Sequence, residues 1–295
     1  MITERSGEAM SKKQHPISLL TVATALCAGL YAVGCYMTAY IPSPWGFGQF
    51  RPAVIIPAFF ATIFGPIPAG VGAAMGTLIA DSVKHGSLYP GSLIAAVPGN
   101  FIGFFLFGYI VRGKFTWRRF ITASNLTLAV ANFIVAFLYV FAYKVLYAQT
   151  FLDLPVEALI VLSTGLTIFW FVTMLPFVLV VTPLLIRAVA AAFPSVVPKD
   201  VKVHSLGQDL PKTTFSLALL VPGLIMLLAG LAVTFSALGN YMSLYWGPKY
   251  FPPIIMDLIQ LMFYGSGVVL CVLGILAFTG KMFFRPKVPA EAKVA

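Results

Sequence analysis

Long apolar runs separated by short polar stretches cover almost the whole chain. Eight such runs can be traced: Ile17–Tyr40, Pro52–Phe64, Pro66–Val83, Gly91–Val111, Ile121–Tyr147, Val156–Ile186, Phe215–Ser236 and Ile254–Thr279. A helix needs about 20 apolar residues to cross a bilayer, whereas strands of a membrane barrel alternate over about ten. The pattern therefore predicts an all-α polytopic membrane protein with eight helices. The second run is too short for a full span and predicts a broken span or a re-entrant arm.

The segment from Gln49 to Asp81 joins two of these runs by an unusual turn. At its centre lies Phe64-Gly65-Pro66. A Gly-Pro pair ends one helix and begins the next, because proline cannot donate a backbone hydrogen bond and disfavours helix for the residue before it. The segment predicts a membrane hairpin whose two open ends return to the same face. We therefore expect Arg51 to lie close to Asp81 and Lys84.

Composition and charge agree with a membrane protein. Of 295 residues, 60% are apolar and 9% are charged, whereas a soluble domain carries about 25% charged residues. If the N-terminus is cytoplasmic, 15 of the 19 Lys and Arg residues face the cytoplasm, and the remaining four are Arg51, Lys84, Lys144 and Lys249. The positive-inside rule therefore predicts a plasma-membrane protein with both termini cytoplasmic. The net charge of +10 then serves orientation and contact with the anionic lipid bilayer rather than nucleic-acid binding.

One polar stretch, residues 188–213, divides the chain. It predicts a cytoplasmic linker between a six-helix membrane domain (17–187) and a two-helix hairpin (214–280). Residues 1–16 and 281–295 are predicted to be cytoplasmic tails.

Sequence signatures of an enzyme are largely absent. The chain has no His-Glu-x-x-His zinc pair, no acidic run that holds magnesium and no nucleotide-binding glycine loop. Its three histidines are scattered, and its three cysteines lie inside apolar runs, where small buried packing residues are the expected role. We therefore expect no catalytic activity, no metal and no cofactor.

Charged residues at membrane depth are costly, so each is a candidate for function. Asp81 has two interpretations: a surface carboxylate paired with Lys84, or a contact to a ligand. Arg51 follows the aromatic residues Trp45 and Phe47. It is either an interfacial anchor or the partner of a carboxylate or planar ligand.

Amide side chains in the membrane carry the same ambiguity. Asn100 follows Pro98-Gly99, which interrupts a helix, so its side chain either satisfies a freed backbone carbonyl or contacts a ligand. Asn125 and Asn132 lie two helical turns apart on one face, where hydrogen bonds between helices explain them as well as a ligand does.

Small residues form ridges on two helices, Ala25, Ala28, Gly29 and Ala32 on the first and Gly70, Ala73, Ala74 and Thr77 on the third. Such ridges let helix backbones approach closely, either inside the molecule or at a partner.

Residues 17–187 contain several motifs that together suggest a family: Ala28-Gly29-Leu30-Tyr31-Ala32, Gln49-Phe50-Arg51-Pro52, the Phe64-Gly65-Pro66 turn, the Gly/Ala-rich helix that ends in Asp81, and Pro98-Gly99-Asn100. This block resembles the substrate-binding S components of energy-coupling factor (ECF) vitamin transporters. The resemblance implies a six-helix S-component fold with a pocket toward the outer face. It also implies that Ala28 and Ala32 dock on a transmembrane coupling subunit driven by two ATPases. The two additional C-terminal helices depart from the family.

The predicted function is therefore the capture of a small organic solute or vitamin at the outer face for import. The predicted pocket residues are Trp45, Phe47, Arg51, Asp81, Lys84, Asn100 and Asn132. A first alternative is an accessory or structural subunit that reuses the S-component fold, and a second is an intramembrane enzyme. An open pocket with converging polar groups favours transport, whereas a pocket filled by its own side chains favours the accessory role.

Overall fold

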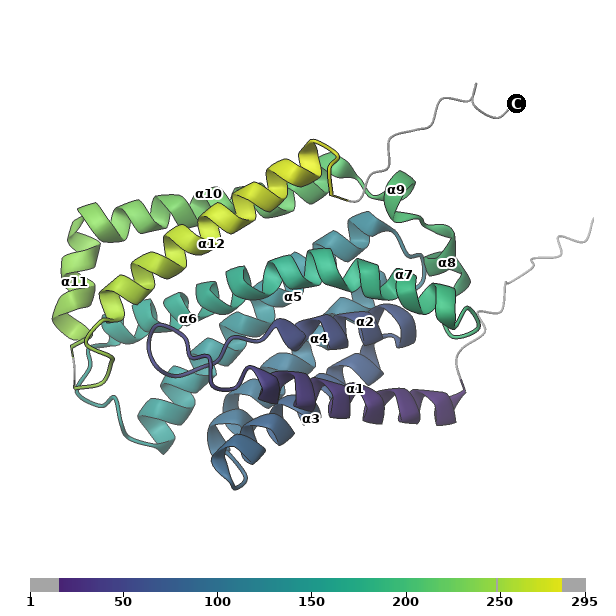
Figure 1. The fold of residues 1–295 in the computed structure, drawn as a ribbon. Coiled ribbons are helices and arrows are strands. Elements are labelled where there is room, and N and C mark those ends of the chain that lie inside the picture. The colour runs from purple at the N-terminus through teal and green to yellow at the C-terminus, as the bar shows by residue number, and fades with distance from the viewer. Residues whose placement is uncertain (1–15, 248, 283–295) are drawn as a thin grey trace, which may run out of the picture.

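The computed structural model describes residues 16–247 and 249–282. Its α-helices are α1 (Ile17–Met37), α2 (Ile55–Phe64), α3 (Pro66–His85), α4 (Val97–Val111), α5 (Trp117–Phe137), α6 (Val156–Pro176), α7 (Thr182–Ala192), α8 (Lys199–Val203), α9 (Leu206–Asp209), α10 (Lys212–Phe235), α11 (Ala237–Tyr245) and α12 (Ile255–Phe278) (Figure 1). A short 3₁₀ turn, η1 (Pro52–Val54), precedes α2. Wider π-helical turns extend three other helices, namely η2 (Ser92–Ala96) before α4, η3 (Leu138–Tyr147) after α5, and η4 (Phe177–Val181) between α6 and α7.

In the part of the chain that the structure describes, six helical segments are long and apolar enough to cross a membrane: Ile17–Met37, Ser92–Val111, Trp117–Tyr147, Val156–Ala192, Lys212–Phe235 and Ile255–Phe278. The described residues contain no β-strand and one isolated β-bridge, between Pro42 and Gln49. The prediction of an all-α polytopic membrane protein is therefore confirmed. Each of the eight predicted apolar runs forms a helix, but α2 and α3 do not belong to the six candidate spans.

The short helix α2 lies inside the bundle. Every residue from Pro57 to Ile63 is buried, and α2 packs against α1, α3, α4 and α7. Because protein surrounds it, α2 does not have to match the full thickness of the bilayer.

The predicted hairpin turn is confirmed at Gly65. This residue has φ +90°, a backbone region that favours glycine, and it separates the end of α2 from Pro66 at the start of α3. The turn lies close to Gly108, since a Cβ atom there would come within 2.6 Å of the Pro66 nitrogen. The loop residues before α2 and the last turns of α3 consequently meet at the other end of the hairpin.

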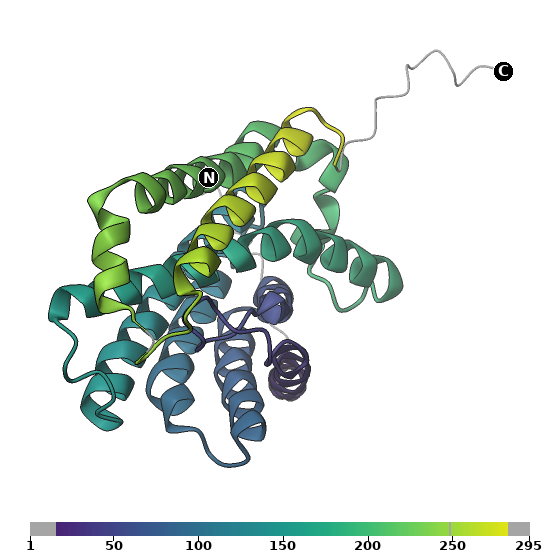
Figure 2. The ribbon, with the colours of Figure 1, turned by 60° about the vertical axis from the view of Figure 1, so that its left-hand side comes forward.

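The helices pack as neighbours in chain order, with α1 against α3, α3 against α4, α4 against α5 and α5 against α6. The C-terminal helices α10 and α12 pack chiefly against each other and lie along one flank, opposite α1 and α3 (Figures 1 and 2). The start of α1 and the end of α12 lie at the same end of the bundle (Figure 1).

The polar connection between α7 and α10 folds onto the bundle. Helix α7 continues to Ala192, beyond the predicted end of the first block at residue 187. Further along, Asp200 accepts a hydrogen bond from the backbone N–H of Phe115 at 3.0 Å. Arg187 donates to the carbonyls of Lys202 and His204 at 3.1 and 3.2 Å. The loop before α5 and this connection therefore lie at the same end of the molecule.

Candidate functional site

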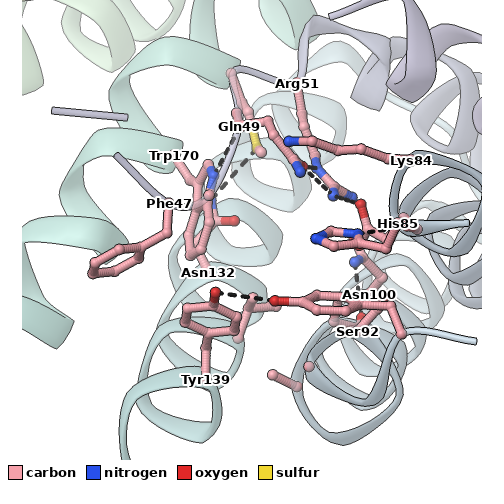
Figure 3. Close-up of a pocket in the computed structure, with 18 of the residues that line it drawn as sticks. Phe47, Gln49, Arg51, Lys84, His85, Ser92, Asn100, Asn132, Tyr139 and Trp170 are labelled. Atoms are coloured by element: carbon pink, nitrogen blue, oxygen red, sulfur yellow. Dashed lines mark hydrogen bonds and ion pairs between the residues drawn. The ribbon is translucent and has the colours of Figure 1, made fainter. Parts of the chain in front are cut away.

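A cavity of about 160 Å³ opens between the loop before α2 and the ends of several helices. Its wall draws on the loop at residues 46–51, the last turns of α3, the η2–α4 segment, α5 with η3, and α6. Figure 3 shows Asn132 and Trp170 on one side of the space and His85 and Asn100 on the other. Together with Tyr31 of α1, which also lines the cavity, these five segments form one site.

Arg51 and Asp81 form a buried ion pair in the wall of this cavity. The Nη2 atom of Arg51 lies 2.5 Å from Oδ1 of Asp81, and both residues are buried. The predicted proximity of the two is confirmed. The same guanidinium donates to Oε1 of Gln49 at 2.6 and 3.2 Å and to the hydroxyl of Thr77. Most of its N–H groups are consequently engaged within the protein.

Lys84 does not pair with Asp81, so that interpretation of the carboxylate is wrong. The Lys84 ammonium donates to the carbonyl of Ala39 at 2.6 Å and lies 5.5 Å from the centroid of the Tyr40 ring. Neither partner lines the cavity. Although Lys84 contributes to the wall, its charge is directed to the loop that follows α1.

Two amide residues face the cavity from opposite helices. The Nδ2 atom of Asn100 donates to the carbonyl of Ala96 at 2.8 Å, which agrees with the predicted role of satisfying the helix backbone. Asn132 is only 5% exposed, and its one hydrogen bond within the described structure goes to the sulfur of Met174 at 3.7 Å. Thioether sulfur is a weak acceptor, so the Asn132 amide retains most of its hydrogen-bonding capacity.

A serine that the sequence analysis missed adds a second unengaged group. Ser92 is 1% exposed and lines the cavity, and its Oγ atom has no hydrogen-bond partner among the described residues. Buried polar groups in native proteins are nearly always paired. An unpaired hydroxyl in a cavity wall therefore marks a position where a bound molecule can supply the partner.

Aromatic residues complete the wall, again from positions not predicted. Tyr89 and Tyr139 join through their hydroxyls at 3.2 Å, and the His85 ring stacks on Tyr89 with 3.8 Å between centroids. The indole N–H of Trp170 donates to the carbonyl of Gln49 at 3.0 Å. This bond ties the loop before α2 to α6. The Tyr89–Tyr139 and Trp170–Gln49 contacts join residues far apart in the sequence, so no single segment reveals these roles.

The two predicted aromatic pocket residues behave differently. Phe47 contributes to the wall, although its ring points away from His85 and Asn100 (Figure 3). Trp45 does not line the cavity. It is fully buried beside Gly165, where a Cβ atom would come within 2.5 Å of its ring, and it contacts Trp246.

A group of rings that we call the mouth cluster covers this loop: Trp45, Phe47, Phe151, Trp246, Tyr250 and Phe251. Centroid distances are 5.7 Å for Trp45–Trp246, 6.0 Å for Phe47–Phe251 and 5.9 Å for Phe47–Phe151. Nearby, Asp153 accepts hydrogen bonds from Lys249 and Tyr250, which lower the pKa of its carboxyl to about 2. The connection between α11 and α12 is thereby joined to the loop before α6 through Asp153 and to the loop before α2 through Phe47.

Part of the small-residue ridge of α1 packs within the molecule. Ala32 is 7% exposed, and the carbonyl of Ala28 would lie 2.8 Å from a Cβ atom on Gly76 of α3. The predicted docking residues Ala28 and Ala32 therefore pack toward the bundle. On the exposed side of α1, a Cβ atom added at Gly29 would meet nothing within 4 Å.

No protein-family model, curated protein or solved structure matches this chain. Among the described residues, no three His, Cys, Asp or Glu side chains gather in a way that could hold a metal ion.

Proposed function

We propose that this chain is a membrane-embedded solute-binding component of a transport system. The observation that carries the proposal is the cavity beside Asn132 and Ser92, which has space for a small molecule and polar groups without full protein partners. Binding sites for small molecules combine apolar and aromatic walls with a few placed polar groups. The wall described above has this composition.

A purely structural role offers no reason for such a cavity. Protein interiors pack as densely as organic crystals, and voids larger than a water molecule are few. An unpaired hydroxyl and a weakly paired amide cost stability when nothing binds them. Both features have an explanation if a solute occupies the space for part of the working cycle.

The proposal extends to an S component of the ECF type, with α1 to α7 as the binding unit and α10 and α12 as an additional pair. The loop at residues 46–51 and the last turns of α3, which line the cavity, lie at the end of the bundle opposite the start of α1 (Figure 1). The charge distribution predicts that this end faces outward. In this orientation the protein would capture its solute from outside the cell for import. A transmembrane coupling subunit with two ATPases would then dock on the exposed side of α1, at Ala25 and Gly29.

The test is mass spectrometry of small molecules that co-purify with the detergent-extracted protein. The Ala96→Phe variant fills the cavity, whereas Leu93→Phe places the same ring on an exposed position of the same segment. We expect a compound with the wild type and with Leu93→Phe that is missing from Ala96→Phe. The same elution volume in size-exclusion chromatography verifies folding. Recovery that is equal for all three proteins, or absent from all three, contradicts the proposal and favours the accessory role.

A further inference from the structure

Arg51 and Asp81, two of the three charged side chains in the cavity wall, compensate one another before any ligand binds. The Arg51 guanidinium is shared among Asp81, Gln49 and Thr77. The Lys84 ammonium is bonded to the backbone of Ala39. A charged ligand that recruited Arg51 would separate a buried ion pair and leave Asp81 without its partner, which is costly in a low-dielectric interior.

Three of the side chains that remain available are neutral. Asn132 offers both an N–H donor and a carbonyl acceptor, and its only partner in the described structure is a thioether sulfur. Ser92 offers a hydroxyl with no partner in the described structure. Asn100 uses its Nδ2 atom on the helix backbone, which leaves its carbonyl oxygen as an acceptor. These three side chains therefore offer donors and acceptors but no unit charge.

The shape of the wall restricts the ligand further. Flat side chains border the space, with Trp170 on one side and Tyr139 below the opening in Figure 3. Aromatic walls favour planar ligands that stack on them. A cavity of about 160 Å³ accommodates a single substituted ring, since an engineered protein cavity of about 150 Å³ binds benzene.

Resting on the proposed function, we infer that the cavity binds an uncharged planar ring that carries a primary amide or an equivalent paired donor and acceptor. An amide matches Asn132 because each group supplies one donor edge and one acceptor edge. A carboxylate offers acceptors only and an amidinium offers donors only. Each of these ions therefore leaves one atom of Asn132 unpaired.

Three probes of nearly equal shape test this inference on the full chain in detergent: benzamide, benzoate and benzamidine at pH 7. Their dissociation constants are measured by equilibrium binding of the radiolabelled compounds. We expect benzamide to bind about tenfold or more tightly than either ion, which corresponds to the loss of one well-placed hydrogen bond and the burial of a charge. Benzoate or benzamidine binding as tightly as benzamide overturns the inference, and so does an absence of benzamide binding.

Variants of the amide locate the interaction. Asn132→Leu keeps the side-chain volume and removes the hydrogen bonds, so we expect benzamide to bind about tenfold more weakly. Asn125→Leu is the matched control, since Asn125 lies on the same helix, bonds to the carbonyl of Ile121 and does not line the cavity. Ser92→Ala serves as a second variant if Asn132→Leu does not fold. Equal loss at positions 125 and 132, or no loss at 132 and 92, contradicts the assignment.

The experiments distinguish failure of the neutral-amide inference from failure of the proposed solute binding. A charged compound that co-purifies with the wild type and disappears in Ala96→Phe overturns the neutral-amide inference and leaves solute binding intact. Benzamide binding that is unchanged in Ala96→Phe contradicts both.

Discussion

At the scale of single residues, the side chain of Arg51 connects more of the site than any other that we describe. It bonds to the loop through Gln49 and to α3 through Thr77 and Asp81. Its partners are fixed by the Gly65 turn, which returns α3 to the level of the loop. The guanidinium therefore holds the open end of the hairpin together rather than presenting a free charge to solutes.

Removing one partner of the Arg51–Asp81 ion pair should destabilise the protein strongly. Arg51→Met leaves the Asp81 carboxylate buried without its counter-charge, so we expect a loss of about 3–5 kcal/mol in the free energy of unfolding. The double variant Arg51→Met, Asp81→Leu should recover part of this loss, because no unpaired charge remains. Denaturant titration in detergent micelles measures both. Arg187→Met is the control, since among the described residues Arg187 bonds only to backbone carbonyls. A loss at Arg51 no larger than at Arg187 would argue against a structural ion pair.

At the scale of elements, the contact between α1 and α3 depends on glycine. A Cβ atom at Gly72 would lie 2.5 Å from the Cβ of Cys27, and one at Gly76 would lie 2.8 Å from the carbonyl oxygen of Ala28. Neither distance is tolerated without movement of a helix. The Gly/Ala-rich sequence of α3 is thus explained by close packing inside the molecule.

We expect Gly72→Ala to lower the free energy of unfolding by about 1–3 kcal/mol, the usual cost of overpacking. The same substitution at Gly29 of α1 meets open space, so it should be neutral or stabilising by up to about 1 kcal/mol through helix propensity. Thermal unfolding of the two variants under identical detergent conditions makes the comparison. Similar melting temperatures for both would mean that α1 and α3 do not approach as closely as described.

A second prediction at this scale concerns the mouth cluster. Phe251→Ala removes a ring that contacts both Phe47 and Phe151, and the loop over the cavity should then open more often. A cysteine placed at Ser92, in a background without the three native cysteines, reports this as faster labelling by a water-soluble thiol reagent. We expect an increase of several-fold. Phe278→Ala, an exposed position at the far end of α12, should leave the rate unchanged; equal acceleration by both would remove the cluster from control of access.

Local signals predicted much of this architecture from sequence. The Gly-Pro turn, the short second helix and the proximity of Arg51 to Asp81 follow from residues within one hairpin. The burial of Trp45 and the role of Ser92 did not follow, because they depend on partners distant along the chain. Gly165 and Trp246 surround Trp45, and no periodicity in one segment encodes that meeting. The sequence predicts a close-packing ridge on α1, and the structure shows Ala32 buried toward the bundle and Gly29 facing open space.

At the scale of the whole molecule, the distribution of basic residues predicts the orientation in the membrane. Lys114 and Gln208 are exposed and lie in segments that pack at one end, whereas Leu152 is exposed in the loop that meets the mouth cluster. Single cysteines at 114, 152 and 208 in intact cells should react with a membrane-impermeant reagent only at 152. Labelling at 114 but not at 152 would invert the molecule and place the cavity mouth in the cytoplasm.

The mouth cluster also fixes the order in which the site is completed during synthesis. Its rings come from the loop before α2, the loop before α6 and the connection between α11 and α12. Because the chain leaves the ribosome N-terminus first, α1 to α6 can surround the cavity well before Phe251 has been translated. The nascent protein therefore passes through a stage in which the cavity is formed and its cover is not. The connection between α11 and α12, in the last part of the bundle to be translated, therefore completes the cover of the cavity.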